Sequence, residues 1–320
     1  MADKALAVRL ILNRIGVGIL TLLLVSAVIF TITSLLPGDA AQEALGQSAT
    51  PETVAALRAQ YGLDKPGPVR YATWLGGLVT GNLGQSFTAS MPVSELVATR
   101  LPKSLLLAAV TAAVSVPIAL AIGILAAMGR GGALDRALSL ATLSMVAVPE
   151  FLVATIAVLV FAVKLRWFPA LSNTVDIKDA GQFFRTYAMP VLTLCFVVIA
   201  QMARMTRAAV LDQLSASYVE MAVLKGAKPA RVALRHALPN AIGPIANAVA
   251  LSLSYLLGGV VIVETIFNYP GIASLMVDAV TNRDMPVVQA CAMVFCFAYL
   301  LLVLVADLVA ILSNPRLRHR

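Results

Sequence analysis

Charged residues divide the chain into long uncharged stretches that are rich in Leu, Val, Ile and Ala. Six such stretches, each of 18 to 28 positions, lie between Arg14–Asp39, Lys103–Arg130, Arg136–Lys164, Arg185–Arg204, Arg235–Glu264 and Asp284–Asp307, and only the third is interrupted, by Glu150. A helix needs about 20 apolar residues to cross a hydrocarbon core of ~30 Å, whereas a barrel strand would show alternation with a period of two. The pattern therefore predicts an all-α, polytopic membrane protein with six transmembrane helices.

Composition supports the same class. The 320 residues are 60% hydrophobic and only 12% charged, compared with roughly 25% charged in an average soluble domain. A soluble protein of this size could not cover so much apolar surface, which excludes an ordinary soluble enzyme, a disordered chain and a small disulfide-stapled domain. The net charge of +8 comes from basic residues beside the apolar stretches. Membrane topology explains this arrangement, so no nucleic-acid partner is expected.

The distribution of Lys and Arg predicts the orientation. With the N-terminus inside, 14 of the 24 basic residues fall on cytoplasmic segments and 10 outside, five of these within the long first loop. Long loops contribute little to the positive-inside rule, so both termini are expected in the cytoplasm. Residues 71–94 are also uncharged, but their glycines and polar residues favour turns. We therefore expect residues 36–103 to form an extracytoplasmic excursion.

The longest cytoplasmic connection, residues 204–239, has the signals of two short helices. Ser217-Tyr-Val-Glu220 has the form of a capping box, which would start the first helix. Gly226 suits the left-handed residue that follows a helix, and Pro229 suits the first turn of the next. The second helix is expected to run towards Pro239. By pattern alone, this hairpin could rest on anionic lipid or dock a soluble partner.

A resemblance favours the docking role. Glu220-Met-Ala222, three residues, Gly226, nine residues and His236-Ala-Leu-Pro239 resemble the EAA loop of permease subunits in bacterial ABC importers, with Met221 and His236 as departures. The resemblance implies a coupling helix that lies in a groove of an ATP-hydrolysing subunit. The expected coupling residues are Ser217, Tyr218, Glu220, Ala222, Lys225, Gly226, Arg231, Arg235 and Pro239.

The resemblance covers essentially the whole chain. Segments similar to the first permease subunit of dipeptide/oligopeptide transporters include Leu36–Asp39, Tyr61–Pro66, Gly81–Ser86, Arg100–Pro102, Arg235–Ala241, Glu264–Gly271, Asn282–Asp284 and Asn314–Arg316. This similarity implies the type I ABC importer permease fold in one transmembrane domain over residues 1–320. Di- and oligopeptides are the implied cargo. Permeases of this kind also carry nickel chelates, opines or oligosaccharides, which remain alternatives.

The resemblance also implies the partners. They are a second homologous permease, two ATPase subunits or domains, and an extracytoplasmic binding protein, all at a bacterial inner membrane. The chain lacks the G-x-x-x-x-G-K-[ST] phosphate loop. We therefore expect a transport subunit rather than an enzyme, with ATP and Mg on partner chains and no cofactor of its own.

Glu150 is the acid expected well inside a span, at a position where related permeases commonly have a small hydroxyl residue. Thirteen uncharged residues separate it from Arg136, which in a straight helix is a rise of ~20 Å and places it beyond mid-depth. Intramembrane carboxylates tend to face a polar cavity or a partner. We hypothesise that Glu150 lines the translocation path and favours cationic or amine-bearing substrates. It could instead pair with the partner permease or lie protonated at a packed interface.

Residues 264–284 follow the fifth span. By resemblance they form an outer gate loop, with Glu264, Phe267, Pro270 and Gly271 as candidate gate residues, although a simple turn at the membrane surface fits the pattern equally. Ala273 replaces the family's usual glycine, which leaves the backbone geometry of this loop in question.

Two other classes of membrane protein fit the pattern less well. An ion-coupled secondary transporter would be expected to show an internal repeat and several intramembrane ion ligands. An intramembrane enzyme would need a nucleophile or metal-binding motif within the spans. The sequence shows neither set of features.

Overall fold

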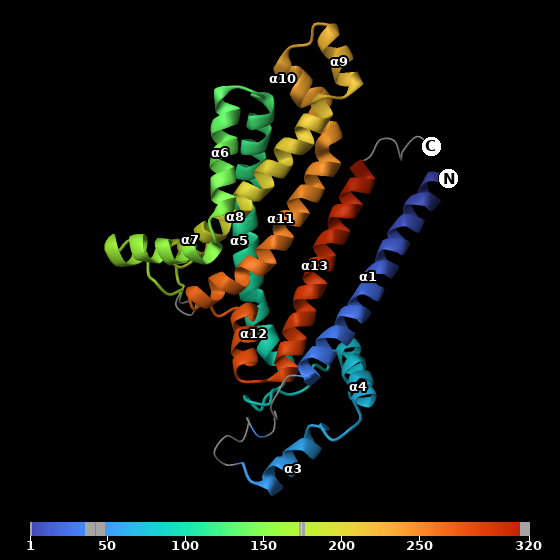
Figure 1. Cartoon of the computed structure of the whole chain (residues 1–320), viewed down its shortest axis with the longest axis vertical. Coiled ribbons are helices and arrows are strands. Elements are labelled where there is room, and N and C mark those ends of the chain that lie inside the picture. Colours follow the sequence, from blue (N-terminus) through green and yellow to red (C-terminus); the bar gives the residue numbers. More distant parts are fainter. Residues whose placement is uncertain (1, 36–41, 43–48, 173, 175–176, 314–320) are drawn as a thin grey trace. The chain divides into compact units, whose positions relative to one another are not determined.

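The computed structural model describes residues 2–35, 42, 49–172, 174 and 177–313 (Figure 1). Its α-helices are α1 (Ala2–Leu35), α3 (Pro51–Gln60), α4 (Gly67–Thr80), α5 (Val93–Met128), α6 (Ala133–Ala147), α7 (Glu150–Ala157), α8 (Ala180–Leu214), α9 (Ser217–Leu224), α10 (Pro229–Arg231), α11 (Leu238–Ile266), α12 (Ile272–Thr281) and α13 (Met285–Ser313). Two π-helical segments, η2 (Val158–Lys164) and η3 (Val232–Ala237), follow α7 and α10. Leu36–Asp39 and Asn314–Arg316 lie outside the described residues.

The helices long enough to cross a membrane agree with the expected spans. Among the described residues, five single stretches qualify by length and composition: Ile11–Leu35, Val93–Met128, Ala180–Leu214, Val232–Ile266 and Met285–Val309. Ala133–Ala147 and Glu150–Lys164 add a sixth if this bent pair is counted as one span. In lipid a helix satisfies all its backbone groups internally, which is why uncharged stretches of this length become helices. The prediction of an all-α polytopic protein is confirmed.

The third span is not the straight helix that the sequence suggested. It bends by 93° between α6 and α7, which meet at nearly a right angle (Figure 1). Val148 and Pro149 are both extended, with ψ of 124° and 138°. Proline has no N–H to continue the helix and disfavours helical geometry in the residue before it. The expectation that Glu150 lies ~20 Å along one helix from Arg136 is therefore wrong, because that rise assumes an unbroken helix.

The chain divides into two compact units. Unit 1 contains Met1–Gly16, Leu106–Tyr269 and Tyr299–Arg320, and unit 2 contains Val17–Leu105 and Pro270–Ala298. Helices α1, α5 and α13 each contribute one part to either unit.

Unit 2 has a core built from α5, α12 and α13. Its buried members are Val93, Val97, Ile272, Leu275, Ala279, Val287, Ala290 and Cys291. Residues 71–94, expected outside the membrane, form most of α4 and a turn closed by a bridge between Gln85 and Pro92. Residues 71–92 are not among the candidate spans of the described chain, while residues 93 and 94 already belong to α5 and to its span.

A buried carboxylate fixes this turn within unit 2. Asp284, only 1% exposed, precedes α13. It accepts hydrogen bonds from the hydroxyls of Ser86 and Thr88 at 2.5 and 2.9 Å, and from the backbone N–H groups of Phe87 and Thr88 at 3.1 and 3.2 Å. Four donors compensate the carboxylate for the lost water, so Asp284 joins the turn to the corner between α12 and α13.

In unit 1, α5, α8 and α11 pack closely. Ala127, Val210 and Ala241, one from each helix, form a buried cluster. Gly123 on α5 lies so close to α8 that a Cβ there would lie 2.7 Å from both the Ala203 carbonyl oxygen and the Thr206 Cβ. Small residues at such positions let helix backbones approach each other in membrane proteins.

Candidate functional site: the α9–α10 hairpin and the broken helix

The connection between α8 and α11 is a helical hairpin beyond the ends of these two helices (Figure 1). Its first helix, α9, follows the extended residue Ala216, and no side chain caps it. The N–H groups of Val219 and Glu220 donate to the Ala216 carbonyl at 2.9 and 3.2 Å. The predicted capping box is therefore wrong. The helix begins one residue earlier than a Ser217 cap requires, so Ser217 is already helical.

The predicted end of this helix is confirmed. Gly226 has φ of +80°, the left-handed conformation that glycine adopts without a Cβ penalty. The Gly226 N–H donates to the Val223 carbonyl at 2.9 Å, and the Ala227 N–H donates to the Ala222 carbonyl at 3.1 Å. This pair of bonds is a Schellman motif, which satisfies carbonyls at the end of α9. Pro229 then starts α10, as expected.

The second helix of the hairpin does not stop at Pro239. Helix α10 passes through η3 directly into α11, and the Leu238 N–H donates to the Ala233 carbonyl five residues back. Pro239 lies in the first turn of α11 and has no N–H for the carbonyl four residues earlier. A π-helical turn accommodates such a defect while the helix continues. The hairpin is therefore continuous with the fifth span.

Helix α9 leaves most of its apolar side chains exposed. Val219 is buried against Val232 and Ala237 of η3. In contrast, Tyr218, Met221, Val223 and Leu224 are 42%, 53%, 56% and 75% exposed. Of the other predicted coupling residues, Ser217, Glu220, Lys225, Gly226, Arg231, Arg235 and Pro239 are exposed and Ala222 is half-buried. The hairpin thus exposes four apolar side chains of α9, which we call the α9 patch, together with several charged side chains.

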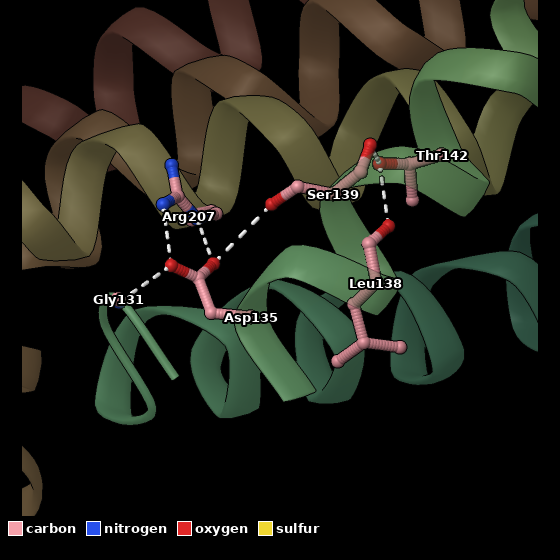
Figure 2. A network of polar contacts seen from close by, with 6 residues as sticks. All are labelled: Gly131, Asp135, Leu138, Ser139, Thr142 and Arg207. Carbon is pink, nitrogen blue, oxygen red and sulfur yellow. Dashed lines mark hydrogen bonds and ion pairs between the residues drawn. The ribbon is translucent and has the colours of Figure 1, made fainter. Parts of the chain in front are cut away.

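An ion pair that the sequence did not reveal lies where α6 packs against α8. Figure 2 shows the Asp135 carboxylate facing the Arg207 guanidinium. Arg207 Nε and Nη2 donate to its two oxygens at 2.7 and 2.9 Å, while the Gly131 N–H and the Ser139 hydroxyl donate at 2.9 and 3.2 Å. Asp135 is 4% exposed. No local pattern connects residues 72 positions apart.

Glu150 lies directly after the bend, at the start of α7, and is half-buried. Its carboxylate rests against the backbone of α11, where a Cβ on Gly259 would lie 2.7 Å from Oε2 and closer still to Oε1. Among the described residues, Glu150 makes no ion pair. The carboxylate therefore occupies a space that exists because residue 259 is glycine.

The end of α11, which contains two of the predicted gate residues, is tightly held. Glu264 and Phe267 are fully buried. Asn268 has φ of +46°. The Tyr269 N–H donates to the Glu264 carbonyl, five residues back, at 2.8 Å, which is the bond that closes a second Schellman motif. The Tyr269 and Tyr187 hydroxyls share a hydrogen bond of 2.9 Å. Burial, together with this bond, raises the pKa of Tyr269, so its phenol stays neutral.

The other two predicted gate residues directly precede the next helix, in unit 2. Pro270 is half-buried, and Gly271 is the extended residue before α12. The Ile272 N–H donates to the Ser104 hydroxyl at 2.8 Å. Ala273 is fully buried within the first turn of α12, a conformation that alanine favours. Alanine is therefore accommodated where the family usually has glycine.

Comparisons with known proteins identify the family. Residues 119–319 match the binding-protein-dependent transport system inner membrane component, and residues 7–108 match the N-terminal region of such membrane components. The chain belongs to this family.

Similar permeases cover nearly the whole chain. A probable peptide ABC transporter permease protein of Sinorhizobium fredii is 37% identical over 97% of this chain and 99% of its own length. A putative peptide transport system permease protein of Brucella abortus is 34% identical over the same shares. The glutathione transport system permease protein GsiC of Pectobacterium atrosepticum is 35% identical over 94% of this chain and 95% of its own.

Family membership establishes the general role of the chain. It is a multi-pass permease subunit of an inner membrane and works with ATPase and binding-protein partners. It is not itself an enzyme, because separate subunits hydrolyse ATP in these systems.

One further contact in the permease connects two of its spans. Arg14 of α1 and Asp307 of α13 form an ion pair at 3.3 Å, within unit 1. In the sequence, Asp307 bounds the sixth uncharged stretch, and nothing local to it reveals this partner. Pairing lowers the cost of charges close to the hydrocarbon region.

Proposed function

We propose that this permease imports di- and oligopeptides and forms half of the translocation pathway, while a second homologous permease forms the other half. The names of its relatives support this cargo, since they specify peptides and glutathione, a tripeptide. A binding protein outside the membrane delivers the peptide, and two ATPase subunits or domains supply the energy. The permease provides the path for the peptide and couples its movement to ATP hydrolysis on the partner subunits.

The exposed apolar patch on α9 is the observation that carries the coupling role. Leu224 is 75% exposed at the end of a short helix, and exposed apolar clusters mark interaction surfaces. Lys225, which directly follows α9, and Arg231 of α10 are also exposed, and basic residues near an apolar surface suit an acidic rim on a protein partner. We infer that α9 lies in a groove of an ATPase subunit and receives the movement that ATP binding causes.

A variant of this patch tests the proposal. Leu224→Gln should reduce ATPase co-purification and peptide-stimulated ATP hydrolysis by about tenfold, because a central apolar contact is worth ~1–2 kcal/mol in an interface. Val79→Gln is the control, since Val79 is 84% exposed on α4 in the extracytoplasmic excursion. Equal, unchanged ATPase association in both variants would contradict the coupling role. Stimulation by a sugar-, opine- or nickel-chelate-loaded binding protein, but not a peptide-loaded one, would contradict the cargo.

The orientation of the chain belongs to the same proposal. With both termini in the cytoplasm, the α9–α10 hairpin faces the ATPases, and residues 264–284 face outward as the gate at which the binding protein releases its cargo. The excess of Lys and Arg on the inner segments supports this orientation. A fluorescent protein fused after Arg320 should fluoresce in cells and resist external protease. Cleavage of the fusion in intact spheroplasts would reverse the assignment.

Glu150 is proposed as a pathway residue that favours amine-bearing peptides. Its carboxylate is half-buried beside α11 and has no ion pair among the described side chains, and such groups tend to face polar cavities. Glu150→Gln should reduce transport of lysine-containing peptides by about fivefold more than transport of neutral ones, the size of one weak charge interaction. Equal losses would favour a packing role. Gly259→Ala, which displaces the same carboxylate sterically, is the matched comparison.

A further inference from the structure

The Asp135–Arg207 pair is built to hold two helices in one register. Arg207 contacts both oxygens of Asp135, and the Gly131 N–H and the Ser139 hydroxyl complete the coordination (Figure 2). Two parallel bonds between a guanidinium and a carboxylate fix direction as well as distance. Apolar side chains between helices can slide by a rotamer change, whereas this pair cannot slide without leaving a buried charge unpaired.

The pair lies between the two regions that the proposed mechanism must connect. On α8, Arg207 is seven residues before Leu214, about 10 Å of helix, and only Ser215 and Ala216 separate Leu214 from α9. On α6, Asp135 is in the first turn. The other end of α6, at Ala147, adjoins the bend that leads into Glu150 and α7.

Helix α8 packs closely against its neighbours around the pair. A Cβ on Gly123 would overlap α8 at Ala203 and Thr206, so α5 lies directly against α8 here. The left-handed Gly131, with φ of +77°, lies in the turn between α5 and α6 and donates to Asp135. The carboxylate thus joins three parts of unit 1: α8, the α5–α6 turn and α6.

We propose that Asp135 and Arg207 are positioning residues that make α6 move together with α8, so that displacement of α9 by the ATPase reaches the bend at Pro149 and the carboxylate of Glu150. This inference rests on the proposed function of α9. Helix α6 acts as the rigid connection, and the bend between α6 and α7 is the point at which its movement changes the wall of the pathway.

Loss of the pair should separate ATP hydrolysis from transport. In reconstituted complexes, Asp135→Asn and Arg207→Lys, which keeps the charge but not the paired bonds, should leave assembly intact and ATP hydrolysis within about twofold. Peptide transported per ATP should fall about tenfold, the range of a typical coupling free energy. The matched controls are Asp212→Asn and Arg204→Lys, exposed residues on α8 whose replacement should change neither quantity.

A distance measurement distinguishes positioning from simple stabilisation. Spin labels at Leu140 on α6 and Asp212 on α8, both exposed, in a chain whose three cysteines are replaced, should report one narrow distance with and without ATP. In Asp135→Asn the distance should broaden or shift when ATP binds. An unchanged distribution, or a proportional fall in assembly, hydrolysis and transport, would overturn the proposal.

The outcomes remain distinguishable from failure of the proposed function. If Leu224→Gln abolishes ATPase association while Asp135→Asn leaves transport per ATP unchanged, α9 couples but the pair does not position α6. If Leu224→Gln has no effect, the coupling role of α9 fails first.

Discussion

Helices α9 and α12 are both short, apolar and followed by a reversal of the chain, yet their side chains have opposite surroundings. In α12, Ile272, Ala273, Leu275 and Ala279 are buried. In α9 only Val219 is buried. Hydrophobicity alone therefore does not tell whether a short helix completes the core of its own chain or presents a surface to another. The contrast supports a partner for α9.

The two helices also end alike with different residues. After α12, Arg283 has φ of +54° and the Asp284 N–H donates to the Ala279 carbonyl at 2.8 Å; after α9, Gly226 has φ of +80°. Both ends are Schellman motifs. The turn after α12 tolerates Arg283 in this strained conformation because the hydrogen-bonded carboxylate of Asp284 fixes the position of the next residue. Among the described residues, no carboxylate anchors the turn after α9 in this way, and that turn depends on glycine.

Removal of the Asp284 carboxylate should cause the largest loss of stability. Asp284→Asn places an amide NH2 against hydrogen-bond donors and removes the charge from a site that is 1% exposed. We expect a loss of about 2–4 kcal/mol, seen as a lower melting temperature of the purified complex. Asp278→Asn, at an exposed site on α12, the helix that precedes this turn, is the control. Equal melting temperatures for the two variants would refute the anchoring role.

Leucine truncation compares the two helices directly. Leu275 on α12 is 9% exposed and Leu224 on α9 is 75% exposed. Leu275→Ala should cost about 2–4 kcal/mol because it leaves a cavity, whereas Leu224→Ala should change stability by less than about 0.5 kcal/mol. Thermal unfolding of the permease, purified without its ATPase, checks both values. A large loss in Leu224→Ala would mean that α9 packs against its own chain.

The turn after α9 gives a smaller, purely conformational prediction. Gly226→Ala should destabilise the hairpin by about 1 kcal/mol because alanine is strained in the left-handed region. Gly226→Asn should cost less, since Asn tolerates this region. A Cβ at this position meets no atom of other residues within 4 Å, so the difference reflects the local backbone conformation and not contacts with neighbouring residues. Hydrogen exchange of the 217–231 amides measures the effect, and equal protection in the two variants would contradict it.

The sequence predicted those features that depend on local pattern. Long uncharged stretches became spanning helices, and Gly226 and Pro229 took the positions that their backbone preferences favour. The bend at Pro149 was missed although proline is visible in the sequence, because other spans continue through Pro190 and Pro244. Lipid and neighbouring helices compensate such prolines, so proline alone does not decide whether a span breaks.

The contacts that define the candidate site could not be predicted, because they join residues far apart in the sequence. No local pattern links Asp135 to Arg207, and the fit of Glu150 against Gly259 depends on the bend itself. The capping box at Ser217 failed for a different reason. The motif specifies residue types and spacing, but α9 starts one residue earlier, directly after the extended Ala216.

The smallest expected effect is on association with the ATPase and concerns the exposed charges of the α9–α10 hairpin. Arg231→Gln should alter stability by less than about 0.5 kcal/mol because the residue is exposed. If α10 faces an acidic rim on the ATPase, the variant should still weaken association about two- to threefold at low salt and less at high salt, because exposed pairs are screened. Arg136→Gln, exposed on α6, is the control. Identical salt dependence in both variants would show that Arg231 is only solvated, and the contrast between α9 and α12 would then rest on the apolar patch alone.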